Sequence, residues 1–468
     1  MALRKGRPVG AYSIVGLGKL GASMAAAMAS RGHRVIGVDV NPQSVEAVNA
    51  GRAPVEETAL EETISANRER ISATMDCAEA VLNTEATFVV TPTPSEPSGS
   101  FDVTYARAAF AEIGRALRDK IDYHLVVLTS TVLPGATRYG LITVLENNSG
   151  KRAGIDFGVC YSPEFIALGS VIHDFLNPDF TLIGELDQRS GDMLAAIYSD
   201  VLSNGAPAAR LSIENAELAK VAVNTFVTTK IAFANMLAEI CDRIPGGDVD
   251  EVTRALGMDA RIGSRYLTGA LGYGGPCFPR DNQALSFIAR ALGADAPIAD
   301  ATDRTNRRVP GLLAQRALDG IEDGAQVAVL GLAYKPASHV VEESQGLALA
   351  NAMAAAGAKV RAYDPLAGST ARGGADPRVE LVDSVAACLQ GARVVLITNP
   401  DPEFKELDSA AFAAASRPVR VVDYWRLLPA LGTDSAIDYV GYGRSCDESL
   451  GDRLSDIWFT PSVASVAH

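Results

Sequence analysis

The sequence predicts an α/β protein with two Rossmann-like doubly wound domains joined by a long central helix. Strands and helices alternate from residue 11 to about 210, residues 213–244 contain no Gly or Pro, and a second strand–helix series opens at "QVAVLGLAYKP". We therefore expect three parts, residues 1–210, 211–320 and 321–468. A chain of 468 residues, 48% of them hydrophobic, has material for several cores.

A glycine-rich turn follows the first predicted strand. In "AYSIVGLGKLGASMAAAMASRGHRVIGVDVN" the strand ends at Val15, the helix starts within the turn, and Asp39 ends the next strand. Glycines let the backbone approach a pyrophosphate, and the helix N-terminus supplies unpaired N–H groups. The pattern predicts a dinucleotide site over an ordinary glycine turn, formed by Gly16, Gly18, Lys19, Leu20 and Gly21. Asp39 would bind the adenosine ribose and repel a 2′-phosphate, so we expect NAD rather than NADP.

Polar residues follow the later strands of the first part. "ATFVVTPTP" and "HLVVLTSTVLPG" place Thr93, Ser130 and Thr131 after strands, and "FGVCYSPEFIALGS" does the same for Glu164. Ligands of open parallel sheets collect at these strand ends, so the first three are candidate cofactor or substrate contacts. Turn chemistry explains them equally well, because Thr, Ser and Pro are common after strands.

The central run "IENAELAKVAVNTFVTTKIAFANMLAEICDRI" predicts one long helix. It is apolar around most of its circumference, so we expect it to be buried between domains or at a subunit interface. Glu217, Lys220, Asn224 and Thr228 share one face. This polar stripe is either a solvated edge or one wall of an active site, and the apolar surroundings favour the second interpretation, with Lys220 and Asn224 as its important members.

A conformationally restricted cysteine loop follows, "GYGGPCFPRD" at residues 272–281. Its glycines permit backbone angles closed to other residues, and Pro276 and Pro279 fix φ on either side of Cys277. Such a loop positions a thiol. An isolated cysteine is more often a small buried apolar residue, so the prediction for Cys277 depends on the loop and its companions.

Composition excludes several classes of function. A net charge of −14 and a pI near 4.9 argue against nucleic acid or an anionic membrane as partner. The six cysteines and five histidines are scattered, so we predict no disulfide, no metal site and a cytoplasmic location. The N-terminus resembles a signal peptide only faintly, and no uninterrupted apolar run elsewhere is long enough to span a membrane.

Six segments in order resemble the nucleotide-sugar 6-dehydrogenases, most closely the members that act on UDP-glucose. They are "TPTP", "STVLPGAT", "SPEFIALGSVIHDFLNPDFTLIG", "NAELAKVAVNTF", "GYGGPCFPRD" and "GLAYKP" with a later "ES". The resemblance implies an N-terminal NAD-binding domain, a central helix used for dimerisation and a C-terminal nucleotide-binding domain. It also implies oxidation of a sugar C6 alcohol to a carboxylate, with two NAD and one water used per sugar.

The resemblance also implies roles for individual residues. Cys277 would form a thiohemiacetal and then a thioester with C6. Lys220 and Asn224 would stabilise charge on the C6 oxygen, while Asp281, Glu164 and Thr131 would handle protons and the hydrolytic water. The expected contacts with the nucleotide sugar are Glu164, Phe165, Lys220, Asn224, Arg261, Tyr266, Gly272, Gly274, Tyr334 and Lys335. Arg261 would reach the substrate of a neighbouring subunit, which makes the expected active form at least a dimer.

Departures from the family pattern leave the substrate open. Arg280 replaces the usual Lys before Asp281, Pro276 precedes the cysteine where Ser is common, and Glu342 stands where a cation is typical. UDP-glucose is favoured, and TDP-glucose or a UDP-N-acetylhexosamine is the alternative. A simple hydroxyacid dehydrogenase would release one NADH without needing a thiol. A non-catalytic nucleotide sensor would not require Cys277, Lys220, Asn224 and Asp281 together.

Overall fold

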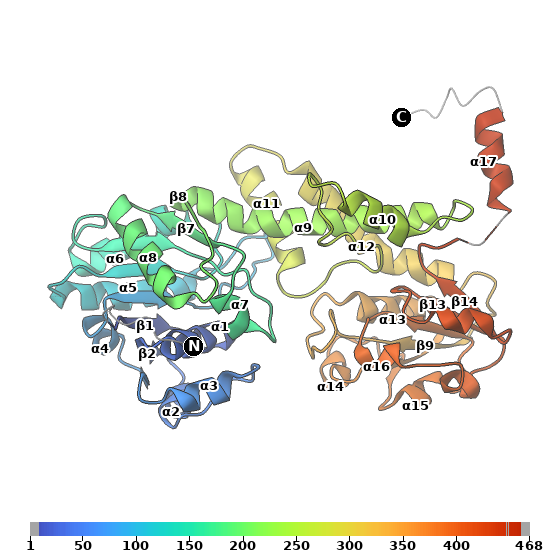
Figure 1. The fold of residues 1–468 in the computed structure, drawn as a ribbon, viewed down its shortest axis with the longest axis horizontal. Coiled ribbons are helices and arrows are strands. Elements are labelled where there is room, and N and C mark those ends of the chain that lie inside the picture. The colour runs from blue at the N-terminus through green and yellow to red at the C-terminus, as the bar shows by residue number, and fades with distance from the viewer. Residues whose placement is uncertain (1–8, 446, 448, 460–468) are drawn as a thin grey trace. The chain divides into compact units, whose positions relative to one another are not determined.

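The computed structural model describes residues 9–445, 447 and 449–459, which form two compact units that meet near residue 222. Each unit contains one sheet, and the long helix α9 (Ile213–Cys241) runs from the first unit into the second (Figure 1). The predicted fold class, two doubly wound α/β domains with a long central helix, is confirmed.

The first unit contains an eight-stranded sheet in the order β3-β2-β1-β4-β5-β6-β7-β8. All neighbouring strands are parallel except β6 and β7, which are antiparallel. The first six strands have the Rossmann order, in which the sequence of strands reverses beside β1. The strands are β1 (Ala11–Val15), β2 (Arg34–Val38), β3 (Ile71–Thr74), β4 (Ala86–Val89), β5 (Leu125–Leu128), β6 (Gly158–Tyr161), β7 (Thr181–Glu185) and β8 (Ala208–Ser212).

Helices cover both faces of this sheet because its strands are apolar on both sides. In β5, Leu125 and Val127 enter one core with α1, α3 and α8, while Val126 and Leu128 enter the other with α4, α5 and α6. The helices are α1 (Lys19–Ser30), α2 (Pro42–Asn49), α3 (Leu60–Ala66), α4 (Cys77–Leu82), α5 (Thr104–Asp119), η1 (Ala136–Leu141), α6 (Ile142–Ser149), α7 (Val171–Leu176) and α8 (Gln188–Val201).

The second unit contains a six-stranded, fully parallel sheet in the order β11-β10-β9-β12-β13-β14, the same topology as the Rossmann part of the first. Val327 and Val329 face a core shared with α9, α12 and α13, and Ala328 and Leu330 face the core under α15 and α16. The strands are β9 (Gln326–Leu330), β10 (Lys359–Tyr363), β11 (Val379–Leu381), β12 (Val394–Ile397), β13 (Val419–Asp423) and β14 (Ile437–Gly441).

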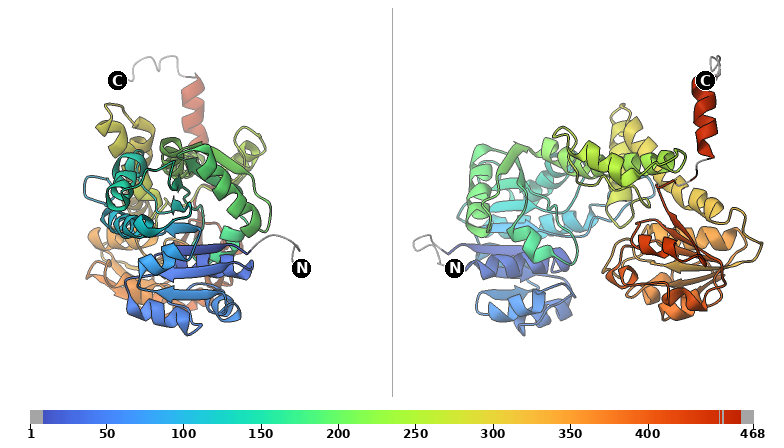
Figure 2. Two further views of the ribbon diagram at one scale, coloured as in Figure 1. Left: turned by 90° about the vertical axis from the view of Figure 1, so that its left-hand side faces the viewer. Right: turned by 45° about the vertical axis from the view of Figure 1, so that its right-hand side comes forward.

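The helices of the second unit fall into two groups, which the right-hand view of Figure 2 shows in yellow and in orange to red. The central group follows α9 and carries the cysteine loop: α10 (Val249–Gly257), α11 (Phe278–Ala291) and α12 (Pro297–Ala317). The remaining helices belong to or follow the second sheet: α13 (Gln345–Ala355), α14 (Gly368–Ala371), α15 (Val385–Leu389), α16 (Pro402–Lys405), η2 (Ala411–Ala414), η3 (Pro429–Thr433) and α17 (Leu450–Phe459).

A partly buried ion pair joins the central helices to the second sheet. The guanidinium of Arg426, whose side chain is 2% exposed, contacts both carboxylate oxygens of Asp250 at 2.7 and 2.8 Å. Nearby, the N–H of Gly443 donates to Asp242 at 2.6 Å. The cysteine loop and the C-terminal sheet therefore belong to one body.

One sequence-based expectation needs adjustment. The central helix ends at Cys241 rather than at residue 244, because the chain turns through Gly247, where a Cβ would lie 2.3 Å from the Cys241 carbonyl oxygen. Beyond Asp447 the described chain forms α17 as far as Phe459, and residues 460–468 lie outside the described part.

One helix of the described chain, α9, is long and apolar enough to cross a membrane by length and composition alone. A core helix of a protein that never enters a membrane passes the same test, so this single helix is weak evidence.

Candidate active site

The glycine turn has the geometry needed to approach a dinucleotide. Gly16 has φ +101°, and a Cβ there would lie 2.3 Å from the carbonyl oxygen of Val90. Gly18 is the N-cap of α1, and a Cβ at this position would meet nothing within 4 Å. The space in front of the helix N-terminus is therefore open, so its free N–H groups can bind a pyrophosphate. These residues fit the NAD that the sequence predicts.

Asp39 lies at the end of β2, beside this turn. Its carboxylate accepts hydrogen bonds from the backbone N–H of Leu17 at 2.7 Å and of Asn41 at 2.8 Å. These bonds hold the acid next to the glycine turn. That is the position from which an acidic residue can reach a ribose hydroxyl.

The hydroxyls after β4 and β5 connect the two strand ends to each other. Thr93 donates to the carbonyl oxygen of Thr131 at 2.8 Å, and Ser130 donates to that of Thr91 at 2.6 Å. Such bonds are typical of turns that follow strands, which is the interpretation that the sequence supports as well as ligand contacts. A role as ligand contact stays a prediction for Thr93, Ser130 and Thr131.

Glu164, Lys220 and Phe165 form one cluster in the first unit. The ammonium of Lys220, a residue only 8% exposed, donates to the backbone carbonyl of Glu164 at 2.6 Å and lies 4.3 Å from the centre of the Phe165 ring. Burial raises the pKa of the Glu164 carboxyl from 4.5 to about 7, although the charge of Lys220 and a hydrogen bond from Tyr198 both lower it. A carboxyl with a pKa near neutrality can both accept and donate a proton at physiological pH.

Tyr198 is a member of this cluster that the sequence analysis missed. It lies on α8, is 3% exposed, and its hydroxyl is 2.7 Å from that of Ser162 as well as bonded to Glu164. Its position depends on α8 packing across the end of β6. No local motif marks such a residue, since a tyrosine on an amphipathic helix is normally read as core.

The raised pKa of Glu164 leads to a testable prediction about how stability depends on pH. Folding favours the protonated form of the Glu164 carboxyl. The stabilisation from this carboxyl is therefore present below about pH 4.5 and is lost as the pH rises through about 7. We expect Glu164→Gln to make the free energy of unfolding of the first unit less dependent on pH between 4.5 and 7. Calorimetry of both proteins across this range, with infrared titration of the carboxyl, measures the difference. Parallel pH dependences in the two proteins would contradict the assignment.

The polar stripe of α9 is buried rather than solvated. Glu217 is 0% exposed and accepts from the N–H groups of Gly135 and Thr137. Further along, Asn224 donates to Asp281 at 2.6 Å, and Thr228 donates to Asn282 at 3.1 Å. The solvated-edge interpretation is therefore wrong. Glu217 and Thr228 hold neighbouring segments, whereas Lys220 and Asn224, one helical turn apart, bind residues predicted to be catalytic.

Cys277 is the N-cap of α11, a 14-residue helix, and its side chain is exposed. The other described cysteines, Cys77, Cys160, Cys241 and Cys388, are buried. A helix N-terminus stabilises a thiolate because its N–H groups carry partial positive charge. Asp281 lies one turn into the same helix, is 3% exposed, and accepts the hydrogen bond from Asn224. The second unit thus brings Cys277, Asp281 and Asn224 together.

The glycines of the cysteine loop are required by close contacts with the loop before α13. A Cβ on Gly274 would lie 2.3 Å from the carbonyl oxygen of Glu343. Gly275 has φ +82°, its N–H donates to the Glu342 carbonyl at 2.9 Å, and a Cβ there would lie 2.6 Å from the Tyr334 ring. Tyr334, predicted to contact substrate, therefore packs on the loop that carries Cys277. Glu342 contributes its backbone carbonyl to these contacts with the cysteine loop.

The remaining predicted substrate residues are more open. Arg261 is highly exposed and pairs with Asp259 at 2.6 Å. Tyr266 has φ +64° and is 51% exposed, with its ring 6.4 Å from that of Phe278. Lys335 lies after β9, its ammonium 5.7 Å from the centre of the neighbouring Tyr334 ring. Arg261 is not brought to the cysteine loop by any described contact, whereas Tyr266 reaches it through Phe278.

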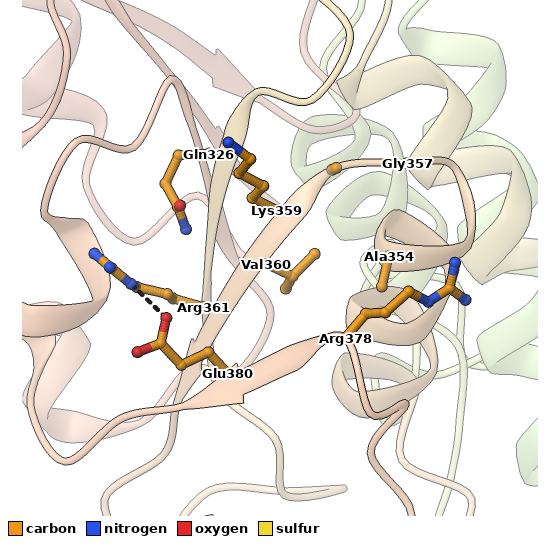
Figure 3. Close-up of a pocket in the computed structure, with 9 residues that line it drawn as sticks. Gln326, Ala354, Gly357, Lys359, Val360, Arg361, Arg378 and Glu380 are labelled. Atoms are coloured by element: carbon orange, nitrogen blue, oxygen red, sulfur yellow. Dashed lines mark hydrogen bonds and ion pairs between the residues drawn. The ribbon is translucent and has the colours of Figure 1, made fainter.

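A separate cavity of about 560 Å³ lies at the opposite end of the second sheet from the carboxyl ends of its strands. Figure 3 shows Gln326 and Lys359, the first residues of β9 and β10, and an ion pair between Arg361 and Glu380 at 2.9 Å. Arg378, on the same rim, pairs with Asp376 instead. None of the predicted site residues lines this cavity.

No group of three or more His, Cys, Asp or Glu side chains that could hold a metal ion occurs in residues 9–445, 447 and 449–459.

The two sheets, the dinucleotide turn and the thiol at a helix N-terminus define a nucleotide-dependent dehydrogenase. Three models of the UDP-glucose/GDP-mannose dehydrogenase family match: the NAD-binding domain at residues 11–202, the central domain at 214–308 and the UDP-binding domain at 328–430. The chain belongs to this family, whose members use NAD. The resemblance found in the sequence is confirmed.

Individual relatives support the same family and differ in substrate. The chain is 37% identical to the UDP-glucose 6-dehydrogenase of Haloferax volcanii, over 87% of this chain and 95% of that protein. It is 35% identical to the GDP-mannose 6-dehydrogenase of Azotobacter vinelandii, over 84% and 92%. The solved UDP-glucose dehydrogenase of Pyrobaculum islandicum superposes with a TM-score of 0.83 at 36% identity, covering 94% of this chain and 99% of that one.

Proposed function

We propose that this nucleotide-sugar dehydrogenase oxidises C6 of UDP-glucose to a carboxylate, giving UDP-glucuronate and two NADH per sugar. The observation that carries the proposal is the exposed thiol of Cys277 at the N-terminus of α11, with Asp281 and Asn224 hydrogen-bonded one turn away. A two-electron alcohol dehydrogenase has no use for such a thiol.

The chemistry explains why a thiol is needed. NAD, when bound, accepts a hydride from C6, and the alcohol becomes an aldehyde after losing its hydroxyl proton. The sulfur of Cys277 then forms a bond to C6, and the carbonyl oxygen takes up a proton to complete a thiohemiacetal. Loss of a second hydride from C6, for which a second NAD would be the acceptor, together with loss of the hydroxyl proton, would convert this carbon to a thioester. Water would then cleave the C–S bond to give the carboxylate and restore the thiol. A fixed thiol also keeps the aldehyde from escaping.

The remaining catalytic roles follow from charge and hydrogen bonding. Lys220 and Asn224 stabilise negative charge on the C6 oxygen, where each donor is worth roughly 3–4 kcal/mol in comparable oxyanion sites. Asp281, Glu164 and Thr131 exchange protons with the substrate and the hydrolytic water. The pKa of Glu164, raised to about 7 by burial, suits this task.

The nucleotide part of the substrate is assigned to the C-terminal domain. Lys335 and Tyr334 follow β9 at the carboxyl end of the second sheet, where doubly wound folds bind ligands. Lys335 and Arg261 would bind the diphosphate, while Phe165, Tyr266, Gly272 and Gly274 would surround the sugar.

The first test is the amount of NADH formed per sugar with limiting UDP-glucose and excess NAD. The proposal predicts two, and it fails if one or none is formed. GDP-mannose, TDP-glucose and UDP-N-acetylglucosamine are assayed in parallel, because GDP-mannose enzymes are nearly as similar to this chain as the UDP-glucose enzyme. Two NADH from another sugar alone would keep the four-electron chemistry and correct the substrate.

The active form is proposed to be a cytoplasmic homodimer that pairs through α9. Phe226, Phe233, Met236 and Ile240 share one face of this helix, and their exposed fractions in the single chain are 67%, 45%, 43% and 45%. A face this apolar is typical of a subunit interface. The net charge of −14 argues against nucleic acid or an anionic membrane as a partner.

A further inference from the structure

The backbone that leads into Cys277 is held by side-chain amides from two different helices. Asn235 of α9 donates to the Leu271 carbonyl at 2.9 Å and accepts from the Ala270 N–H at 2.9 Å. Asn306 of α12 accepts from the Tyr273 N–H at 2.8 Å and donates to the Tyr273 carbonyl at 2.9 Å. Each amide thus occupies one donor and one acceptor of the loop, as a neighbouring β-strand would.

A third amide fixes the side chain of the same tyrosine. Asn282, which directly follows Asp281 on α11, donates to the Tyr273 hydroxyl at 2.8 Å and accepts from Thr228 at 3.1 Å. Tyr273, Asn235, Asn282 and Asn306 are 4%, 5%, 1% and 6% exposed, so water does not compete for these bonds. Tyr273 is therefore tied to α12 by its backbone and to α11 by its hydroxyl.

We propose that Asn306 is a positioning residue for the thiol of Cys277. It holds the peptide of Tyr273, four residues before the cysteine, so that the thiol stays at the N-terminus of α11. The inference rests on the proposed function for its catalytic consequence, since a misplacement of about 1 Å costs on the order of 10²-fold in rate. The predicted effect on the thiol depends only on the loop and does not require the proposed function.

The space around Asn306 explains why no other residue at this position can hold the Tyr273 peptide in the same way. A Cβ at Gly272 would lie 2.2 Å from the Asn306 Oδ1 atom, so the loop backbone passes directly over the amide. Asp at this position would place a second carboxylate oxygen against the Tyr273 carbonyl, because an ionised carboxylate has no donor. Ala would remove the amide that pairs with the buried N–H and C=O of Tyr273, so this loop conformation would lose both hydrogen bonds.

The chain contains a matched control for this clamp. Asn351 on α13 donates to the Gly374 carbonyl at 2.9 Å and accepts from the Asp376 N–H at 2.8 Å. It therefore makes the same pair of backbone bonds, on a loop between β10 and β11 that carries none of the proposed catalytic or binding residues. Asn351→Ala removes an amide clamp from the second unit without touching the cysteine loop.

The experiment compares Asn306→Ala, Asn306→Asp and Asn351→Ala with the unchanged protein in the full chain. Cys277 is alkylated with iodoacetamide at several pH values, and its modified peptide is quantified by mass spectrometry. We expect both Asn306 variants to be alkylated at least about fivefold more slowly at neutral pH, with a higher pH midpoint, because the thiol leaves the helix N-terminus. Asn351→Ala should match the unchanged protein. The isosteric Asn306→Asp keeps the test valid if Asn306→Ala does not fold.

Steady-state kinetics with the nucleotide sugar that gives NADH provide the second readout. We expect kcat of the Asn306 variants to fall about 10²-fold, with KM for NAD and for the sugar within about threefold of the unchanged protein. Alkylation rates of the Asn306 variants equal to those of Asn351→Ala would overturn the proposal. Alkylation needs no substrate, so failure of the clamp is distinguishable from failure of the proposed function, which appears as missing NADH in the unchanged protein.

Discussion

Replacing Cys277 by serine is expected to abolish formation of the carboxylate, with steady-state NADH production falling at least about 10³-fold. Serine keeps the size of the side chain and the start of α11, but its hydroxyl is a much weaker nucleophile at neutral pH. The first oxidation needs no thiol, so at most one NADH per sugar should form. Rapid-mixing absorbance at high enzyme concentration, with mass spectrometry of the sugar product, measures both quantities.

Cys77→Ala is the matched control for this variant. Cys77 also lies at the start of a helix, α4, but it is buried, and burial raises the pKa of its thiol to about 12. A thiol in this state is inert, so its loss should leave turnover per folded molecule unchanged. Two NADH per sugar from Cys277→Ser would refute the thioester route. A comparable loss in both variants would indicate a general effect of losing a thiol.

The fold could be predicted from the sequence because its signals are local and repeated. The middle of each sheet contains short, fully apolar strands, such as "LVVL" in β5 and "VVLI" in β12, which only a sheet covered on both faces can bury. The glycine turn at Gly16 and Gly18 combines a strand end, a positive φ and a helix start within a few residues. The sequence does not mark the last residue of α9, since a helix can stop before the end of a run that lacks Gly and Pro.

The candidate site was only partly predictable, because its supporting residues depend on tertiary contacts. Cys277 and Asp281 are recognisable from one short loop, and Lys220 and Asn224 from their spacing on one helix face. Tyr198, Asn235 and Asn306 carry no such signal: each is a single polar residue on a helix, and its partner lies about 35 residues away along the chain. Only the packing of that helix identifies what the side chain binds.

Lys220→Met is expected to lower kcat by about 10²–10³-fold, the cost of removing one donor from an oxyanion site. The substitution keeps the buried methylenes of Lys220 and removes the ammonium that donates to the Glu164 carbonyl. It has a second, independent consequence for the carboxyl of Glu164. The charge of Lys220 lowers the pKa of that group, so its loss should raise the pKa further above about 7.

Lys120→Met separates these effects from the general cost of losing a buried lysine. Lys120 is 7% exposed and donates to the carbonyl oxygens of Val81, Leu82 and Thr84, away from the proposed site. It should lower the melting temperature while kcat per folded molecule and the infrared titration of Glu164 stay unchanged. If Lys220→Met retains kcat, the oxyanion role is wrong. If kcat falls but the Glu164 titration does not move, the ammonium acts on the substrate without setting the protonation of its neighbour, and proton transfer must be assigned to Asp281, which the Asn224 amide holds at 2.6 Å.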